Sequence, residues 1–233
     1  MTTAPGAPPA PAHLSAARDF VLDAVGITRV VPVVVVDGPD DGVAVTRALV
    51  AGGLPVAEIT FRTAGARDAV AAVADQLPDV LVGAGTVVNV RQVDDAVAAG
   101  ARFLVSPGLS RAVVERAHEH GVPIVPGVAT PTEIIAALDL GLDVVKLFPA
   151  GVLGGVAAVR ALAAPFPDLR FVPTGGISAA SAADYLAQPS VLAVGGSWMV
   201  DKALVAAGNW AEVTRRTAGA VALGQASSSG AGR

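Results

Sequence analysis

The sequence has no cysteine and only two lysines, and its 233 residues carry a small net charge of -4. Without cysteine, disulfides, thiolate catalysis and thiolate metal ligands are all excluded. The slight acidic excess and the absence of a basic block make nucleic acids and anionic membranes unexpected partners. Aromatic residues are scarce at 4%, whereas 53% of the residues are hydrophobic. A composition of this kind can fill a sizeable core with small side chains.

The chain also lacks a long hydrophobic run. The longest valine-rich run, residues 30–36, is far too short to span a bilayer as a helix. The first residues, "MTTAPGAPPAPA", contain neither the basic nor the apolar region of a secretory signal. We therefore expect a cytoplasmic protein with one domain over residues 13–222, between a disordered Pro/Ala-rich tail (1–12) and a disordered Ser/Gly-rich tail (223–233).

Short valine-rich segments alternate along the chain with alanine-rich stretches that have helical spacing. Their repeat of about 20–27 residues fits a strand, a helix and two short loops. Gly100, Gly121 and Gly141 are placed to end helices. Asn89 and the sequence "TPTE" at 130–133 are placed to begin them. The eight segments lie near residues 30–36, 56–61, 80–84, 103–105, 123–125, 143–147, 171–173 and 192–194.

Eight strand signals, each followed by a helix signal, predict a parallel sheet. In one domain, eight such units favour a closed (β/α)8 TIM barrel, here with an extra N-terminal helix before the first strand. An open doubly wound sheet is the alternative fold. That fold would call for a glycine-rich fingerprint after the first strand, and "VVVVDGPDDG" does not match one.

Three charged residues are predicted to point into the barrel. Side chains alternate between the two faces of a strand, and in "VAEITFR" the apolar set is the one that suits the helices. Glu58 and Arg62 then face inward, and the same argument applied to "DVVKLFP" turns Lys146 inward. The alternative is a salt-bridge network that only neutralises itself, although buried ion pairs are seldom more stabilising than apolar packing. Barrel enzymes keep their chemistry at the carboxyl ends of the strands.

Two glycine pairs end the last two predicted strands, in "PTGGIS" and "VGGSW". Consecutive units lie side by side in a barrel, and glycine lets backbone N–H groups approach an anion closely. Gly175, Gly176, Gly196 and Ser197 are therefore candidates for a phosphate site, which barrels often build in these two loops. The alternative for each pair is a simple tight turn.

The remaining polar candidates are fewer. Thr86, at the end of "GAGT", can face the site next to Glu58, or it can belong to an ordinary strand-end turn. His118 and His120 are two residues apart near a helix end and so do not point the same way. No cluster has metal-ligand spacing, and we expect no metal.

A buried lysine suggests covalent chemistry with a ketone. The amine attacks a carbonyl only when it is unprotonated, and burial together with a nearby cation such as Arg62 favours the neutral form. The iminium formed with a keto substrate withdraws electrons from the neighbouring bond. Glu58 can move protons, Arg62 can grip a carboxylate, and the phosphate site can hold the far end of the substrate. Together these groups indicate cleavage or formation of a C–C bond in a phosphorylated keto acid.

From residue 30 to residue 198 the chain resembles the class I 2-keto-3-deoxy-6-phosphogluconate (KDPG) and 4-hydroxy-2-oxoglutarate (KHG) aldolase family. The matching blocks are "VPVVVV", "ALVAGGLPVAEITFRT", "VGAGTV", "SPGLS", "PGVAT", "VKLFPA", "PTGGIS" and "GGSW". The resemblance implies that Lys146 is the Schiff-base lysine and Glu58 the general acid and base. It implies contacts to the substrate carboxylate or neighbouring oxygens from Arg62, Thr86 and Thr174, a pocket lined by Pro107 and Phe148, and a phosphate set of Gly175, Gly176, Gly196 and Ser197.

The same resemblance implies the reaction, which is reversible cleavage of KDPG to pyruvate and glyceraldehyde 3-phosphate in the Entner–Doudoroff route. It also implies a homotrimer that needs no metal and no organic cofactor. Three alternatives stay open. They are an aldolase for the galactonate epimer, a non-catalytic barrel that binds phosphosugars, and a metal-dependent epimerase or aldolase on the same fold.

Overall fold

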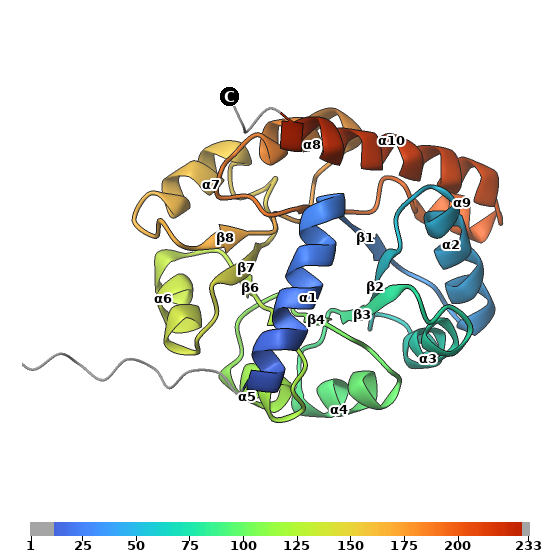
Figure 1. Ribbon diagram of the computed structural model, residues 1–233, viewed down its shortest axis with the longest axis horizontal. Helices are drawn as coiled ribbons and strands as arrows, with labels where there is room; N and C mark the ends of the chain where they lie inside the picture. The colour runs from blue at the N-terminus through green and yellow to red at the C-terminus, as the bar shows by residue number, and fades with distance from the viewer. Residues whose placement is uncertain (1–11, 230–233) are drawn as a thin grey trace, which may run out of the picture.

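The computed structural model describes residues 12–229 and shows a ring of short parallel strands surrounded by helices (Figure 1). Six strands form one sheet in the order β5-β4-β3-β2-β1-β9, and three form a second in the order β6-β7-β8. Isolated bridges from Phe171 to Val191 and from Thr174 to Gly195 join β8 to β9. The ring therefore closes, and the predicted (β/α)8 barrel with an extra N-terminal helix is confirmed.

The strands are short and strictly sequential around the ring. Each pairs in parallel with its neighbours, as in Val33 opposite Glu58 and Gly127 opposite Lys146. The strands are β1 (Val30–Val34), β2 (Val56–Thr60), β3 (Leu81–Gly85), β4 (Leu104–Val105), β5 (Ile124–Val125), β6 (Gly127–Val128), β7 (Val144–Leu147), β8 (Arg170–Phe171) and β9 (Val194–Gly196).

The fifth strand of the barrel is split by a proline. The segment expected near residues 123–125 appears as β5, and Pro126, which has no N–H to donate to a ladder, separates it from β6, a short strand that was not predicted. The carbonyl of Pro126 still accepts a hydrogen bond from the backbone N–H of Lys146, at 2.9 Å. The split therefore leaves the barrel closed and divides it into the two assigned sheets.

The helices begin and end largely where local signals predict. Thr130 and Glu133 form a capping box, and Asn89 accepts a hydrogen bond from the N–H of Gln92 at 2.9 Å. Gly100 and Gly121 follow their helices in the left-handed region, with φ of 90° and 68°. The helices are α1 (Ala12–Thr28), α2 (Pro39–Ala51), α3 (Ala66–Gln76), α4 (Val90–Ala98), α5 (Arg111–Glu119), α6 (Pro131–Asp139), α7 (Val156–Ala163), α8 (Ala179–Leu186), α9 (Lys202–Ala206) and α10 (Trp210–Ser229). None of those in residues 12–229 has the length and hydropathy needed to cross a membrane.

The predicted tails need correction. Helix α10 continues through residues 223–229, where a disordered Ser/Gly-rich segment was expected. Gly224 is buried, and a Cβ there would lie 3.3 Å from the backbone carbonyl carbon of Thr28, so the glycine lets α10 pack closely on the end of α1. At the other end, Ala12 belongs to α1. The rest of the two predicted tails, 1–11 and 230–233, lies outside the described residues.

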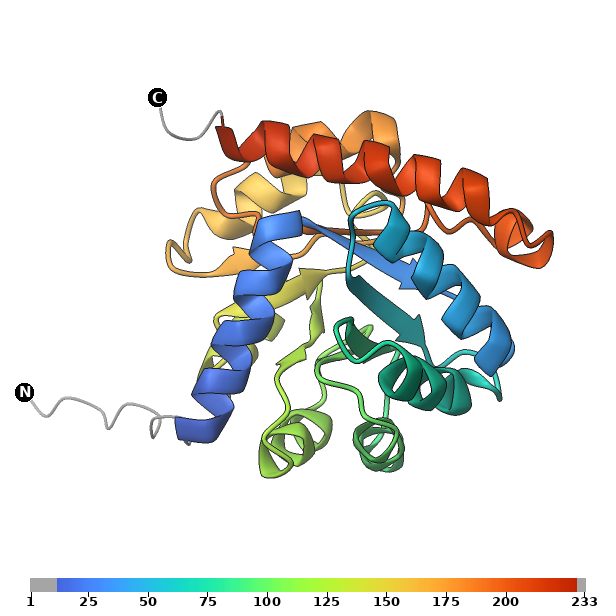
Figure 2. The same cartoon turned by 45° about the vertical axis from the view of Figure 1, so that its right-hand side comes forward.

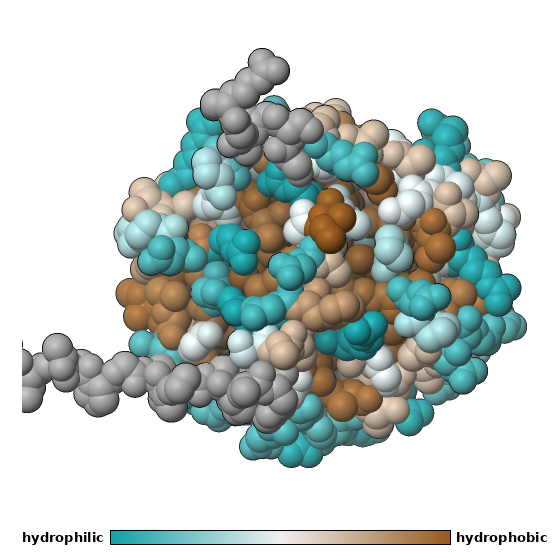
Figure 3. Space-filling model, in the orientation of Figure 1, coloured by the Kyte–Doolittle hydropathy of each residue, from teal (hydrophilic) through white to brown (hydrophobic). Residues whose placement is uncertain are grey.

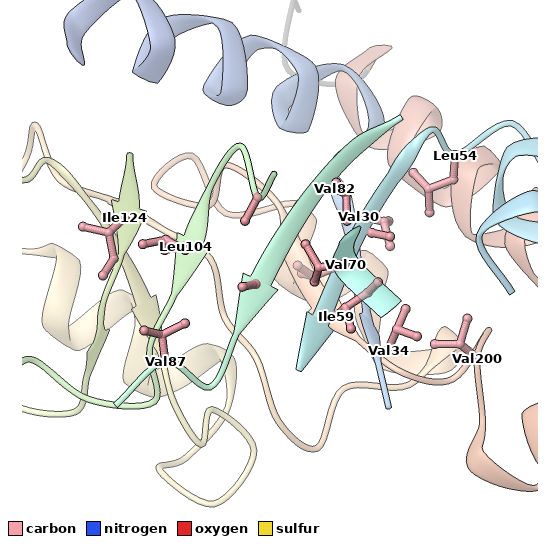
Figure 4. Packing of buried hydrophobic residues seen from close by; sticks show 14 of the residues in the cluster. Val30, Val34, Leu54, Ile59, Val70, Val82, Val87, Leu104, Ile124 and Val200 are labelled. Atoms are coloured by element: carbon pink, nitrogen blue, oxygen red, sulfur yellow. The ribbon is translucent and has the colours of Figure 1, made fainter. Parts of the chain in front are cut away.

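Apolar side chains form two cores, one on each side of the strand ring. The larger lies between strands and helices and includes Ile59 and Leu104, which are fully buried (Figure 4). Burying a side chain of this size stabilises the fold by roughly 1.5–3 kcal/mol. The smaller core fills the end of the lumen where the strands begin, and it includes side chains of α1 (Val21, Leu22 and Val25). Helix α1 crosses one end of the ring (Figures 1 and 2), so that this end of the lumen is covered.

Candidate active site

Lys146 lies in the barrel lumen on β7. Val145 and Leu147, its neighbours on the strand, are completely buried in the core between strands and helices. Val144 belongs to the core inside the lumen, so Lys146, which has the same parity, points inward as the alternation of the sequence predicts. Only 4% of the residue is exposed. The structure thus places one of the two lysines of the chain at the position where burying a charge is most costly.

Glu58 reaches the same point from the other side of the ring. Strands β2 and β7 are four strand positions apart in either direction around the barrel. The Lys146 Nζ atom lies 3.6 Å from Glu58 Oε1, and the two side chains are 4% and 3% exposed. Among the described residues, Oε1 has no hydrogen-bond partner. Burial raises the pKa of the Glu58 carboxyl, against the opposing effect of Lys146 and Arg62. The site therefore holds an amine and a carboxyl group together in nearly dry surroundings.

Two glycines of β3 make room for inward-facing side chains, Gly85 for Glu58 and Gly83 for Phe103. A Cβ at Gly85 would lie 2.7 Å from the carboxyl carbon of Glu58, and one at Gly83 would overlap the ring of Phe103. The motif "GAGT" predicted only the place of Thr86, and the role of its two glycines was not predicted. The available signal was that both glycines share the parity of the inward-facing positions on a strand that neighbours β2.

Arg62 and Thr86 form a polar pair at the rim. The exposed Arg62 follows β2, and its Nε donates a hydrogen bond to Thr86 Oγ1 at 3.3 Å. Thr86 has a φ of 60°, the left-handed region that a β-branched residue rarely adopts. Backbone strain of this kind costs about 1–3 kcal/mol and is concentrated at functional sites. The strained turn holds the Thr86 hydroxyl beside the guanidinium of Arg62.

Two other predicted residues lie near the Lys146 amine, and a third packs against the strand beside β7. The Phe148 ring centroid is 5.1 Å from Nζ, and Thr174 lines a cavity together with Lys146 and Glu58. Pro107 is less direct. Its carbonyl packs on Gly127, which is the register partner of Lys146 and where a Cβ would collide with that carbonyl. Phe148 and Thr174, which follow β7 and β8, therefore lie near the amine, whereas Pro107, which follows β4, lies against β6.

The predicted phosphate set lies on two adjacent loops. Thr174 bridges to Gly195, so the segment with Gly175 and Gly176 runs beside the segment with Gly196 and Ser197. The N–H of Gly151 donates to the carbonyl of Gly175 at 2.9 Å. Gly175 and Gly176 have φ of 91° and 76°, a conformation open mainly to glycine. Ser197 is exposed. This arrangement brings backbone groups and one hydroxyl to the same edge of the barrel.

Two histidines, His118 and His120, lie away from this site, on and next to α5. His118 is half-buried, and burial lowers its pKa. The ring of His120 lies 2.7 Å from Asp94, which also pairs with Arg116. Within residues 12–229, no group of three or more histidine, aspartate or glutamate side chains is arranged to hold a metal ion.

The family model for KDPG and KHG aldolases matches residues 21–216, which is most of the chain. The chain belongs to this aldolase family. A curated relative, the 2-dehydro-3-deoxy-phosphogluconate aldolase of Treponema pallidum, is 50% identical over 194 residues, covering 83% of this chain and 92% of the relative.

Solved structures of KDPG aldolases have the same fold. The Legionella pneumophila enzyme, in which pyruvate was captured at low pH as a covalent carbinolamine intermediate, aligns with a TM-score of 0.82 and 38% identity, over 84% of this chain and 96% of its own. The Zymomonas mobilis ZM4 enzyme with 3-phosphoglycerate aligns with a TM-score of 0.82 and 41% identity, over 87% of this chain and 95% of its own. This member of the family thus shares the barrel fold and 38–41% of its aligned residues with these two aldolases.

Proposed function

We propose that this family member is a class I aldolase that reversibly cleaves KDPG to pyruvate and glyceraldehyde 3-phosphate through a Schiff base at Lys146. The observation that carries the proposal is the buried Lys146–Glu58 pair, with 3.6 Å between Nζ and Oε1. The carbinolamine captured in the Legionella relative is the species that a lysine amine and pyruvate form first. Aldolase and lyase activity follow from the same relatives, which include KDPG and KHG aldolases.

The geometry supports a sequence of proton transfers around one amine. Neutral Nζ attacks the keto carbon, and the carbinolamine loses its hydroxyl as water to give the iminium. As the C–C bond breaks, Glu58 on the opposite strand takes the proton of the substrate hydroxyl group that becomes the aldehyde oxygen. The transfer is direct or passes through water. The bonding electrons move to the iminium nitrogen and form an enamine, while the aldehyde leaves. Protonation of the enamine and hydrolysis of the iminium then release pyruvate and restore the amine.

The remaining residues are proposed to hold the substrate at its two ends. Arg62, held by Thr86, offers a planar guanidinium that can grip the carboxylate next to the keto group. Thr174 lies on the wall of the cavity that contains the reacting pair. Phe148 and Pro107 would line the apolar side of the bound substrate. At the far end, Gly175, Gly176, Gly196 and Ser197 would bind the phosphate through backbone N–H groups and a hydroxyl.

The proposed function also includes a second substrate, a metabolic route and an oligomeric state. We propose cleavage of 4-hydroxy-2-oxoglutarate to pyruvate and glyoxylate as a second activity, and a place in the Entner–Doudoroff route of the cytoplasm. A homotrimer is proposed from the family resemblance. Support for association comes from a mean hydropathy of +0.61 and from exposed apolar side chains such as Val152, at 86% exposure. The galactonate epimer is the alternative substrate.

Steady-state cleavage assays test the proposal. We expect the gluconate-derived substrate to be cleaved with a higher kcat/KM than its galactonate epimer, and 4-hydroxy-2-oxoglutarate to be cleaved measurably. Lys146→Ala should abolish all three activities, whereas Lys202→Ala, on an exposed lysine of α9, should leave them unchanged. EDTA should have no effect; lasting inactivation that added metal reverses would favour a metal-dependent enzyme. Substrate binding without any turnover would favour a phosphosugar-binding barrel.

A further inference from the structure

Helix α1 contributes directly to the surroundings of the reacting pair. It packs against the first inward-facing side chains of the strands, such as Val31, Val56 and Leu81. These side chains belong to the end of the barrel opposite the loops that carry the phosphate candidates. Figure 4 shows α1 on the side where the strands begin, with the strands running away from it. The helix therefore covers the closed end of the lumen, and substrate enters at the other end.

A single cavity joins α1 to the reacting pair. It measures about 30 Å³ and is lined by Val21, Leu22 and Val25 of α1 together with Glu58 and Lys146. The three α1 side chains are only 4%, 8% and 5% exposed. A space of this size is too small for the substrate, and its lining is apolar apart from Glu58, Lys146 and Thr174, so the α1 side of the cavity offers water no hydrogen-bond partner. The α1 side chains thus stand between the reacting pair and the solvent at the closed end.

The structure fixes α1 firmly in this place. Arg18 forms a salt bridge with Asp143, the residue just before β7. At the other end of the helix, Arg29 Nη2 donates hydrogen bonds to the carbonyls of Leu186 and Val191, both at 2.9 Å. Over the middle of the face seen in Figure 3, where Figure 1 shows α1, hydrophobic and hydrophilic residues lie side by side. Contacts to both halves of the ring hold the apolar side of α1 toward the lumen.

We propose that Val21, Leu22 and Val25 are positioning residues for the aldolase reaction, because they exclude water from beneath Lys146 and Glu58 and keep the pair in a dry site. This inference rests on the proposed function for its effect on turnover. The effect of α1 on the pH at which the Glu58 carboxyl titrates does not depend on that function. Neither Arg62, nor Lys146, nor the substrate loops belong to α1, so the helix acts on the reaction only through the surroundings of the pair.

The charges around Glu58 make its carboxyl a usable reporter. Burial raises its pKa, and the two opposing charges come from Lys146 on β7 and from Arg62 just after β2. The neighbouring strand β3 presents Gly83 and Gly85, which have no side chains, and α1 presents apolar ones. A polar group introduced from α1 therefore changes the hydration of Glu58 without removing a charge.

The test replaces Leu22 by a polar residue of similar size and follows Glu58 directly. In Leu22→Asn, the Glu58 carboxyl resonance should titrate at a pH closer to the ordinary value of 4.5 than in the unmodified protein. Carboxyl-labelled NMR resolves this because the chain has only five glutamates, and Glu58→Gln assigns the signal. We expect kcat to fall about tenfold while KM changes by less than about twofold. Leu22→Met, which conserves the volume of the side chain, should keep the Glu58 titration and kcat of the unmodified protein.

Control variants separate this role from a purely structural one. Ile27→Asn introduces the same amide on the exposed side of α1, at a residue that is 75% exposed, and should leave the Glu58 titration and kcat unchanged. Val25→Thr is the milder replacement if Leu22→Asn does not fold, with the same expected direction. An unchanged Glu58 titration in a folded Leu22→Asn or Val25→Thr protein overturns the inference, as does an equal effect from Ile27→Asn. If the unmodified protein forms no adduct with pyruvate, the proposed function fails, and the titration still decides the role of α1.

Discussion

Lys146 and Glu58 meet in the middle of the lumen from strands on opposite sides of the barrel, with 3.6 Å between Nζ and Oε1. Strands on opposite sides point their inward side chains at each other, so one lysine and one glutamate reach the axis together. The distance exceeds that of a hydrogen bond, and both groups are almost completely buried. The pair is therefore close enough for proton exchange, directly or through one water.

Replacing Glu58 by glutamine should separate adduct formation from turnover. Glutamine keeps the size of the side chain but cannot accept a proton, so Glu58→Gln should lower kcat about 100-fold or more. The Lys146 amine remains, and covalent trapping of pyruvate should persist at least in part. Glu115→Gln, an exposed glutamate on α5 paired with Arg111, is the matched control and should behave like the unmodified protein. Full activity in Glu58→Gln would exclude Glu58 as the acid and base.

The pH dependence should report the buried carboxyl. Burial raises the pKa of Glu58 above its ordinary value of 4.5, although Lys146 and Arg62 oppose the shift. The ionised carboxylate accepts the proton in the cleavage step. Activity is then fully present above the raised pKa and is lost as the pH falls through it. The acid limb of kcat/KM against pH should lie above 4.5 and should be absent from the residual activity of Glu58→Gln. A limb at or below 4.5 that is the same in both proteins would contradict this assignment.

A methyl group at Gly85 should displace Glu58. The added Cβ would lie 2.7 Å from the carboxyl carbon, so the side chain has to move away from its position opposite Lys146. A displacement of about 1 Å at a reacting group can cost about 100-fold in rate, and we expect a loss of this order in kcat for Gly85→Ala. Gly108→Ala is the control, since a Cβ there meets nothing within 4 Å. Equal kcat values for the two variants would show that the carboxyl does not need its present place.

The phosphate assignment can be tested by comparing two substrates of the same enzyme. Ser197 is exposed beside Gly196, and its hydroxyl is proposed to bind the phosphate. A hydrogen bond to a charged group contributes about 1.5–3 kcal/mol, so Ser197→Ala should raise KM for the phosphorylated substrate about tenfold or more. KM for 4-hydroxy-2-oxoglutarate, which has no phosphate, should stay within about twofold. An equal rise in KM for both substrates would show that the Ser197 hydroxyl does not bind the phosphate.

Much of the site could be predicted because strand periodicity is a local property. The alternation in "VAEITFR" and "DVVKLFP" is sufficient to turn Glu58 and Lys146 inward, since the flanking residues have only one face that suits the helices. Paired glycines at consecutive strand ends likewise place the two loops side by side. In both cases a short sequence pattern and the parallel order of the strands determine the neighbours.

Other features depend on contacts between distant segments, which no local pattern contains. The short strand β6 beyond Pro126 was missed because a proline usually ends a strand, and only the pairing of residues 127–128 with β7 reveals it. The extension of α10 to Ser229 depends on Gly224 packing against Thr28, so the Ser/Gly-rich composition was misleading. The place of Leu22 beneath the reacting pair follows from how α1 crosses the barrel, a tertiary arrangement that its own sequence does not specify.

The account depends most on covalent bond formation at one amine. Incubating the protein with pyruvate and borohydride, and then locating the reduced adduct by peptide mass spectrometry, tests this directly. We predict a single stable adduct on Lys146, none on Lys202, and none anywhere in Lys146→Ala. Folded protein that binds pyruvate but yields no adduct, or an adduct only at Lys202 or the N-terminal amine, would contradict the account.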